Sequence, residues 1–143
     1  MASIDNADWH CGADDFPEDA PEENGATHIG WFVRWAIGRG LFVKEEDTPD
    51  EMIEAVRTGS TSGRDFVLEQ LDGKLGSGDL SEEGQAFAEA HYDQYLGDVG
   101  ELSLELNLDS AYYVEDSEEN YRKMATALDE RWAHYVAGAS ART

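Results

Sequence analysis

The chain has 143 residues, of which 32 are Asp or Glu and 10 are Lys or Arg, so its formal net charge is −22. This length is typical of one domain, and we expect residues 1–143 to fold as a single unit. Because phosphates and anionic lipid surfaces attract cationic groups, the charge argues against a nucleic-acid or membrane ligand. It favours a basic protein partner, divalent cations or a salt-rich surrounding.

The N-terminal region carries no targeting signal in our interpretation. Residues 1–15 lack the basic segment and the apolar run of a signal peptide, and no segment is apolar enough to cross a membrane. Cys11 is the only cysteine, so no disulfide can form within the chain. We therefore expect a cytoplasmic protein in a reducing compartment.

Residues 1–25 show no helical period and contain two prolines and a series of acids. We predict an irregular acidic arm that lies on a helical core. Trp9 and Phe16 are large apolar groups in this polar segment, and we expect both rings to dock on the domain.

The first helix is predicted over about 27–39, with Thr27 as its N-cap and Gly40 just after its end. Its apolar side chains, which recur at helical spacing, are Ile29, Trp31, Phe32, Val33, Trp35, Ala36 and Ile37. The stripe is so wide that this helix should be central, and both tryptophans should belong to the core.

Three further helices are predicted from their capping residues. Thr48 as N-cap and Pro49 at the first helical position predict a short helix that ends at Gly59. Ser62 begins the next helix, and Ser81 begins another after a turn-rich loop.

The last helix begins after Ser117, and its apolar side chains follow at intervals of three and four residues. We expect residues 138–143 to form a frayed tail. Between these helices, Leu102, Leu104, Leu106 and Leu108 alternate with polar residues. This pattern suits a small β-hairpin over 102–114 as well as a continued helix.

The sequence thus predicts a mainly α fold, a compact bundle of about five short helices with an irregular acidic N-terminal arm. Three segments carry ordered motifs: DWHCGADDFPEDAPEENGATHIGWFVRWAIGRGL, FVLEQLDGKLGSGDLSEEGQAFAEAHYDQYL and DSEENYRKMATALDERW. In order and spacing, from Asp8 to Trp132, they resemble a bacterial family known only as a domain of unknown function. The resemblance implies no chemistry. Small acidic proteins of this kind are often encoded beside toxins as immunity proteins, which suggests toxin inhibition.

One group of residues has the chemistry of a metal site. His10, Asp14, Asp15 and His28, with Cys11 nearby, are of the types that bind divalent metals. Their spacing matches no standard zinc motif, and no oxyanion-hole motif supports a Cys–His nucleophile. We favour the simpler interpretation that the histidines hydrogen-bond locally and the acids are solvated. No cofactor is expected.

The acidic surface is the other candidate site. Its densest clusters are Asp14, Asp15, Glu18, Asp19, Glu22, Glu23, Glu45, Glu46 and Asp47. Such charges can steer a basic partner into place, although charge runs often only solvate a surface.

We therefore predict an acidic protein-binding module rather than an enzyme. In this hypothesis it is an immunity protein that occludes the active site of a basic bacterial toxin. One alternative is a metal-assisted enzyme that uses the region of His10, Asp14, Asp15 and His28. The other is a salt-adapted domain whose acids have no specific role.

Overall fold

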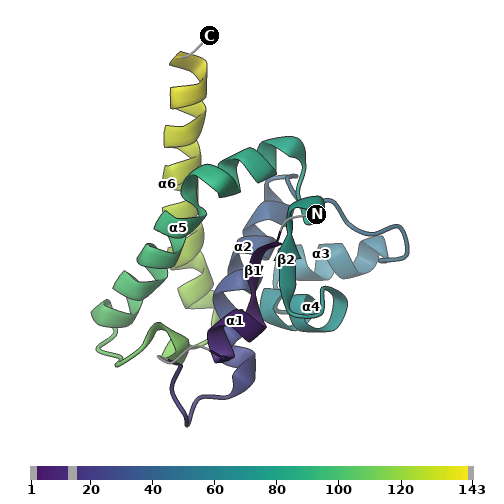
Figure 1. The fold of residues 1–143 in the computed structure, drawn as a ribbon. Helices are drawn as coiled ribbons and strands as arrows, with labels where there is room; N and C mark the ends of the chain where they lie inside the picture. The colour runs from purple at the N-terminus through teal and green to yellow at the C-terminus, as the bar shows by residue number, and fades with distance from the viewer. Residues whose placement is uncertain (1–2, 13–15, 142–143) are drawn as a thin grey trace.

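The computed structural model describes residues 3–12 and 16–141, which form a mainly helical fold with a two-stranded antiparallel sheet (Figure 1). In chain order the strands and α-helices are β1 (Ser3–Asn6), α1 (Ala7–Cys11), α2 (Thr27–Gly38), α3 (Asp50–Thr58), α4 (Gly63–Gln70), β2 (Lys74–Gly76), α5 (Glu82–Glu105) and α6 (Glu118–Ala141). Three short 3-10 helices join them: η1 (Glu22–Ala26), η2 (Ser77–Asp79) and η3 (Ala111–Tyr113). Within the described residues, no helix has the length and apolar character of a membrane span.

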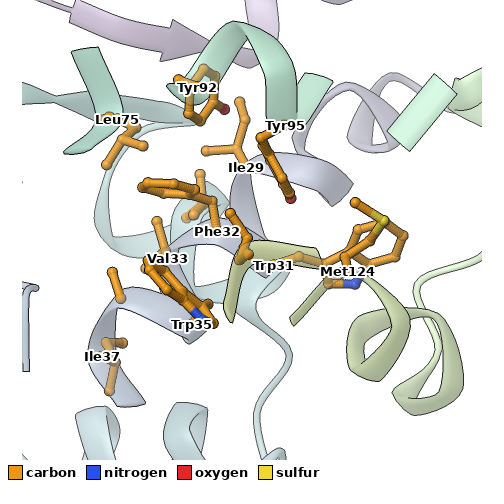
Figure 2. Close-up of a cluster of buried hydrophobic side chains, with 14 of the residues drawn as sticks. Ile29, Trp31, Phe32, Val33, Trp35, Ile37, Leu75, Tyr92, Tyr95 and Met124 are labelled. Atoms are coloured by element: carbon orange, nitrogen blue, oxygen red, sulfur yellow. The ribbon is translucent and has the colours of Figure 1, made fainter. Parts of the chain in front are cut away.

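Helix α2 is the centre of the fold, as predicted. It contacts α3 and α4 on one side and α5 and α6 on the other. Ile29, Val33 and Ala36 have no exposed surface, and Trp31 and Trp35 are also buried. Figure 2 shows these side chains meeting Tyr92 and Tyr95 of α5, Leu75 of β2 and Met124 of α6. Burial on all sides explains the wide apolar stripe in the sequence.

Two glycines bring α2 and α4 into backbone contact. A Cβ atom at Gly30 would lie 2.1 Å from the Arg64 backbone nitrogen, and a Cβ atom at Gly63 would lie 2.0 Å from the Gly30 carbonyl oxygen. No real side chain fits at such distances, so the crossing requires glycine at both positions. At this crossing no space remains between the two backbones.

The N-terminal arm contains more regular structure than the sequence predicted. Strand β1 pairs with β2 (Asp5 opposite Leu75), and α1 follows it directly. The Asn6 side chain caps α1 by accepting a hydrogen bond from the Asp8 backbone N–H. The strand was missed because its partner lies about 70 residues further along the chain, where no local pattern can reveal it.

The two rings of the arm behave differently. Trp9 is 55% exposed, so the prediction that it docks is wrong: α1 turns its indole outward. Phe16 is half-buried, and its ring centroid lies 4.7 Å from that of Tyr112.

The β-hairpin considered over 102–114 does not form. Helix α5 continues through Glu105, Asn107 then adopts a positive φ of 60°, and η3 follows. Leu104 is exposed, whereas Leu102 is buried against the core. The leucine alternation therefore does not follow one face of a strand, and helix packing overrides it.

Most of the predicted helix starts are correct. The hydroxyls of Ser62, Ser81 and Ser117 each accept a backbone N–H in the first turn of α4, α5 and α6. Thr48 does not cap α3, because Pro49 takes an extended ψ of 143° and the helix begins one residue later. Helix α6 is regular through Ala141, so it includes the first four residues of the segment predicted to fray.

Candidate metal centre

Three side chains from separate elements meet beside the N-terminal end of α2. Strand β1 directs the Asp5 carboxylate inward, where only 3% of the residue is exposed. Its Oδ1 atom lies 2.6 Å from His10 Nε2, and its Oδ2 atom lies 2.8 Å from His28 Nε2. The Tyr92 hydroxyl of α5 donates to Oδ2 at 2.6 Å. A buried carboxylate is thus fully surrounded by polar partners, as burial of a charge requires.

His10 is fixed from both sides of its ring. It lies in the last turn of the short helix α1, and its side chain keeps 18% of its surface exposed. Its Nδ1 atom lies 2.7 Å from the Tyr112 hydroxyl of η3, and the Asn24 amide donates to the Tyr112 carbonyl at 2.9 Å. Tyr112 therefore determines how the imidazole is oriented, and the Nε2 atom is left to face Asp5.

His28 is the more buried of the two histidines. It lies in the first turn of α2, and 5% of the residue is exposed. The Tyr95 hydroxyl donates to its backbone carbonyl, which ties this turn to α5. The imidazoles of His28 and His10 meet nearly at right angles, with ring centroids 4.5 Å apart.

Burial and hydrogen bonding set the charges in this cluster. Burial alone would raise the pKa of the Asp5 carboxyl, but hydrogen bonds with His10 and His28 outweigh it and hold that pKa well below its ordinary value. Burial lowers the pKa of His28, even though Asp5 opposes the shift. The cluster is therefore an ionised carboxylate beside a neutral imidazole, which are the protonation states that bind metals.

The separation of the two histidine nitrogens suits a shared metal ion, whereas each nitrogen lies at hydrogen-bond distance (2.6 and 2.8 Å) from an Asp5 oxygen. Asp5, His10 and His28 each offer one ligand atom, and these atoms lie within 4.8 Å of one another. The two Nε2 atoms are 3.2 Å apart. Two nitrogens bound to one tetrahedral zinc ion at about 2.0–2.1 Å would be about 3.4 Å apart. Such an ion would accept a lone pair from each of the three side chains. A hydrogen bond between the two nitrogens uses the lone pair of only one of them, because the other has to carry the proton.

A cavity of about 610 Å³ lies next to the two histidines. Its walls are the middle of α5, from Leu96 to Leu104, and the turn from Asp109 to Tyr112. This volume is within the range of small-molecule sites, and the open positions of a three-ligand metal would face it.

The structure brings together only part of the predicted metal set. His10 and His28, two members of the alternative metal set, lie together, and their carboxylate neighbour is Asp5, which was not in that set. Asp14 and Asp15 lie outside the described residues, and so does the side chain of Cys11. The only local signal for Asp5 is the Ile4–Asp5–Asn6 segment, where a strand meets the N-cap of the helix that carries His10.

The described acids of the predicted partner surface form two separate groups. Glu18, Asp19, Glu22 and Glu23 precede α2, whereas Glu45, Glu46 and Asp47 follow it, and all seven are exposed. Helix α2 has 12 residues and so separates the groups by about 18 Å. A partner of the acidic surface would therefore contact one of the groups or span the length of α2.

Comparison with known proteins gives one result. Residues 3–131 match a family described as a domain of unknown function (DUF7832). No curated protein and no solved structure matches the chain. The chain therefore belongs to this family, and its chemistry has to be argued from its own residues.

Proposed function

We propose that this member of the DUF7832 family is a metal-dependent protein in which Asp5, His10 and His28 hold one divalent transition-metal ion. The observation that carries the proposal is the convergence of their three ligand atoms within 4.8 Å. Imidazole and carboxylate ligands together suit zinc, iron(II) and related ions better than calcium or magnesium. Zinc is the first ion to test.

Two further hydrogen bonds support the metal hypothesis. Metal-binding histidines and carboxylates are usually oriented by outer partners, and here Tyr112 holds His10 while Tyr92 holds Asp5. Three protein ligands leave one coordination position of the metal open for water or substrate. A metal held in this way lowers the pKa of the water bound to it. We infer a metal-assisted hydrolytic reaction on a ligand in the adjacent cavity. Asp5 replaces Asp14 and Asp15 in this version of the metal hypothesis.

The direct test is metal content and zinc affinity. Purified protein, stripped with a chelator and titrated with Zn²⁺ by calorimetry, should bind one ion per chain. Asp5→Asn and His28→Ala should abolish this binding. His134→Ala, which removes an exposed histidine of α6, is the matched control and should bind zinc like the wild type. Zinc binding that is absent in the wild type, or unchanged in His28→Ala, would show that the cluster is only structural.

We also propose a function that depends on a protein partner. In this second proposal the chain is a cytoplasmic immunity protein of a bacterium, and it blocks a basic toxin. It is supported by exposed acids without internal partners, since Glu45, Glu46 and Asp47 make no ion pair within the part of the chain that the structure describes. Their charge is thus available to a basic surface. Neutralising these three residues should slow association with a cognate toxin at low salt. An unchanged association rate at low salt would exclude this group from the interface.

A further inference from the structure

The cavity beside the metal centre has a charge distribution that selects its ligand. Its lining includes apolar side chains (Leu96, Val99, Leu104 and Ala111) and two acids, Glu101 and Asp109. No Lys or Arg is among the described residues that line it. The nearby Arg131 is already engaged by Asp98, whose two carboxylate oxygens accept from it at 2.6 and 2.7 Å. The charged side chains of this lining are acids, so it repels a carboxylate or phosphate ligand and attracts a cation.

Two glycines in the middle of α5 keep the cavity open. Gly97 and Gly100 line it, and a Cβ atom at either position would meet no atom within 4 Å. Neither has a positive φ, so no turn requires glycine there. Glycine inside a helix costs roughly 1 kcal/mol relative to alanine. Neither packing nor backbone conformation explains why glycine is present at these two positions despite this cost. The need to leave space for a ligand in the cavity does explain it.

Along α5, Glu101 lies well beyond the turn that contacts the metal centre. Tyr92 contacts Asp5, and Glu101 lies nine residues further along α5. At 1.5 Å per residue these positions are roughly 13–14 Å apart along the helix axis. A ligand that spans the cavity would thus have its cationic end near Glu101 and its other end near His10 and His28.

We infer that the cavity binds a small organic cation, an ammonium or guanidinium compound with an apolar body. The acids hold the charged end, Leu96 and Val99 contact the body, and the two glycines provide the space. The part of this inference that places the other end of the ligand near the metal rests on the proposed function. The recognition of the cationic end depends only on the cavity.

The test uses three probes with one aromatic body: phenethylamine, 2-phenylethanol and 3-phenylpropanoate. Each is titrated by calorimetry into zinc-loaded wild type and into metal-free Asp5→Asn, and the amide NMR signals of Gly97 and Gly100 locate the binding. We expect the amine to bind about fivefold or more tightly than the alcohol in both proteins, because two acids face its charge. Equal binding of amine and alcohol, or tightest binding of the anion to the metal-free protein, would overturn the inference.

Variants test the contribution of the two acids separately from that of the glycines. Glu101→Gln with Asp109→Asn should reduce amine affinity to that of the alcohol. Gly97→Leu should weaken the binding of both by tenfold or more while it raises the melting temperature. Gly138→Leu, in α6 and also with open space around its Cβ position, is the matched control that should stabilise the fold without affecting binding. Wild-type affinity in Gly97→Leu would overturn the inference.

The outcomes distinguish this inference from the proposed function. If the protein binds no zinc but still prefers the amine through Glu101 and Asp109, the metal hypothesis alone is wrong. If it binds zinc through Asp5 but shows no preference for the amine, the cation site alone is wrong.

Discussion

The two sides of helix α2 use glycine for opposite purposes. On the α4 side, Gly30 and Gly63 allow two backbones to touch, and no volume is left between them. On the α5 side, Gly97 and Gly100 touch nothing and border a cavity. The first pair stabilises the fold, whereas the second pair weakens a helix to keep a space open. The contact between α2 and α4 is closed, whereas the face of α5 that carries Gly97 and Gly100 borders the cavity.

Substitution at the helix crossing should have the largest effect. Gly30→Ala places a methyl group 2.1 Å from the Arg64 nitrogen, so α2 and α4 must separate. We expect a loss of about 3 kcal/mol or more in the free energy of unfolding, measured by urea denaturation. Gly38→Ala, at the end of the same helix with open space around it, should cost nothing. If both variants are equally stable, the closed side of α2 is not as tightly packed as the structure shows.

Metal binding should stabilise the open side. Zinc at 100 times its dissociation constant should raise the free energy of unfolding by about 2.7 kcal/mol, because only the folded chain assembles Asp5, His10 and His28. Thermal melts with zinc and with a chelator measure this difference. In His28→Ala the two melting temperatures should coincide, and a zinc shift that persists there would place the ion elsewhere.

Loss of the outer hydrogen bond to His10 should have a smaller effect. Tyr112→Phe removes the hydroxyl 2.7 Å from His10 Nδ1 but keeps the ring against Phe16. We expect zinc affinity to fall about 10- to 100-fold, as for other outer-shell partners. Tyr113→Phe is the neighbouring control, since its hydroxyl donates to Asp19 and not to the centre. Equal affinity in the two variants would argue that Tyr112 does not orient His10.

The smallest effect on the free energy of unfolding is expected for a glycine that lines the cavity, and it tests the contrast between the two glycine pairs. Gly97→Ala should increase the free energy of unfolding by up to about 1 kcal/mol, because alanine favours the helix and meets no neighbour. Urea denaturation measures it against Gly30→Ala, which has the opposite sign. A destabilised Gly97→Ala would mean that the glycine serves packing after all.

The sequence predicted the parts of this fold that depend on local chemistry. Serine caps identified the starts of α4, α5 and α6, and the apolar stripe around Phe32 identified the central helix. The β1–β2 pairing was missed, since strand partners far apart in sequence leave no periodic trace. The leucine alternation near Leu104 was ambiguous because a helix and a strand can both accommodate it.

Two of the three ligands of the candidate metal centre were predictable for a similar reason. His10 and His28 are rare residue types in this chain, so they attract attention in the sequence. Asp5 is one of 32 acids, and only the pairing of β1 with β2 directs it inward. Composition cannot distinguish Asp5, the one buried carboxylate among the residues that the structure describes, from solvated acids, whereas a tertiary contact can. Trp9 shows the converse error, since a large apolar residue at the surface looks like a core residue in sequence.

The order of the site residues along the chain has a consequence for biosynthesis. Asp5, His10 and His28 are translated first, whereas Tyr92 and Tyr112, which orient two of them, follow 64 and 84 residues after His28. A nascent chain that has emerged only as far as α4 exposes the ligands without the side chains that position them. In the metal hypothesis, the centre is therefore fully oriented only after η3 has left the ribosome.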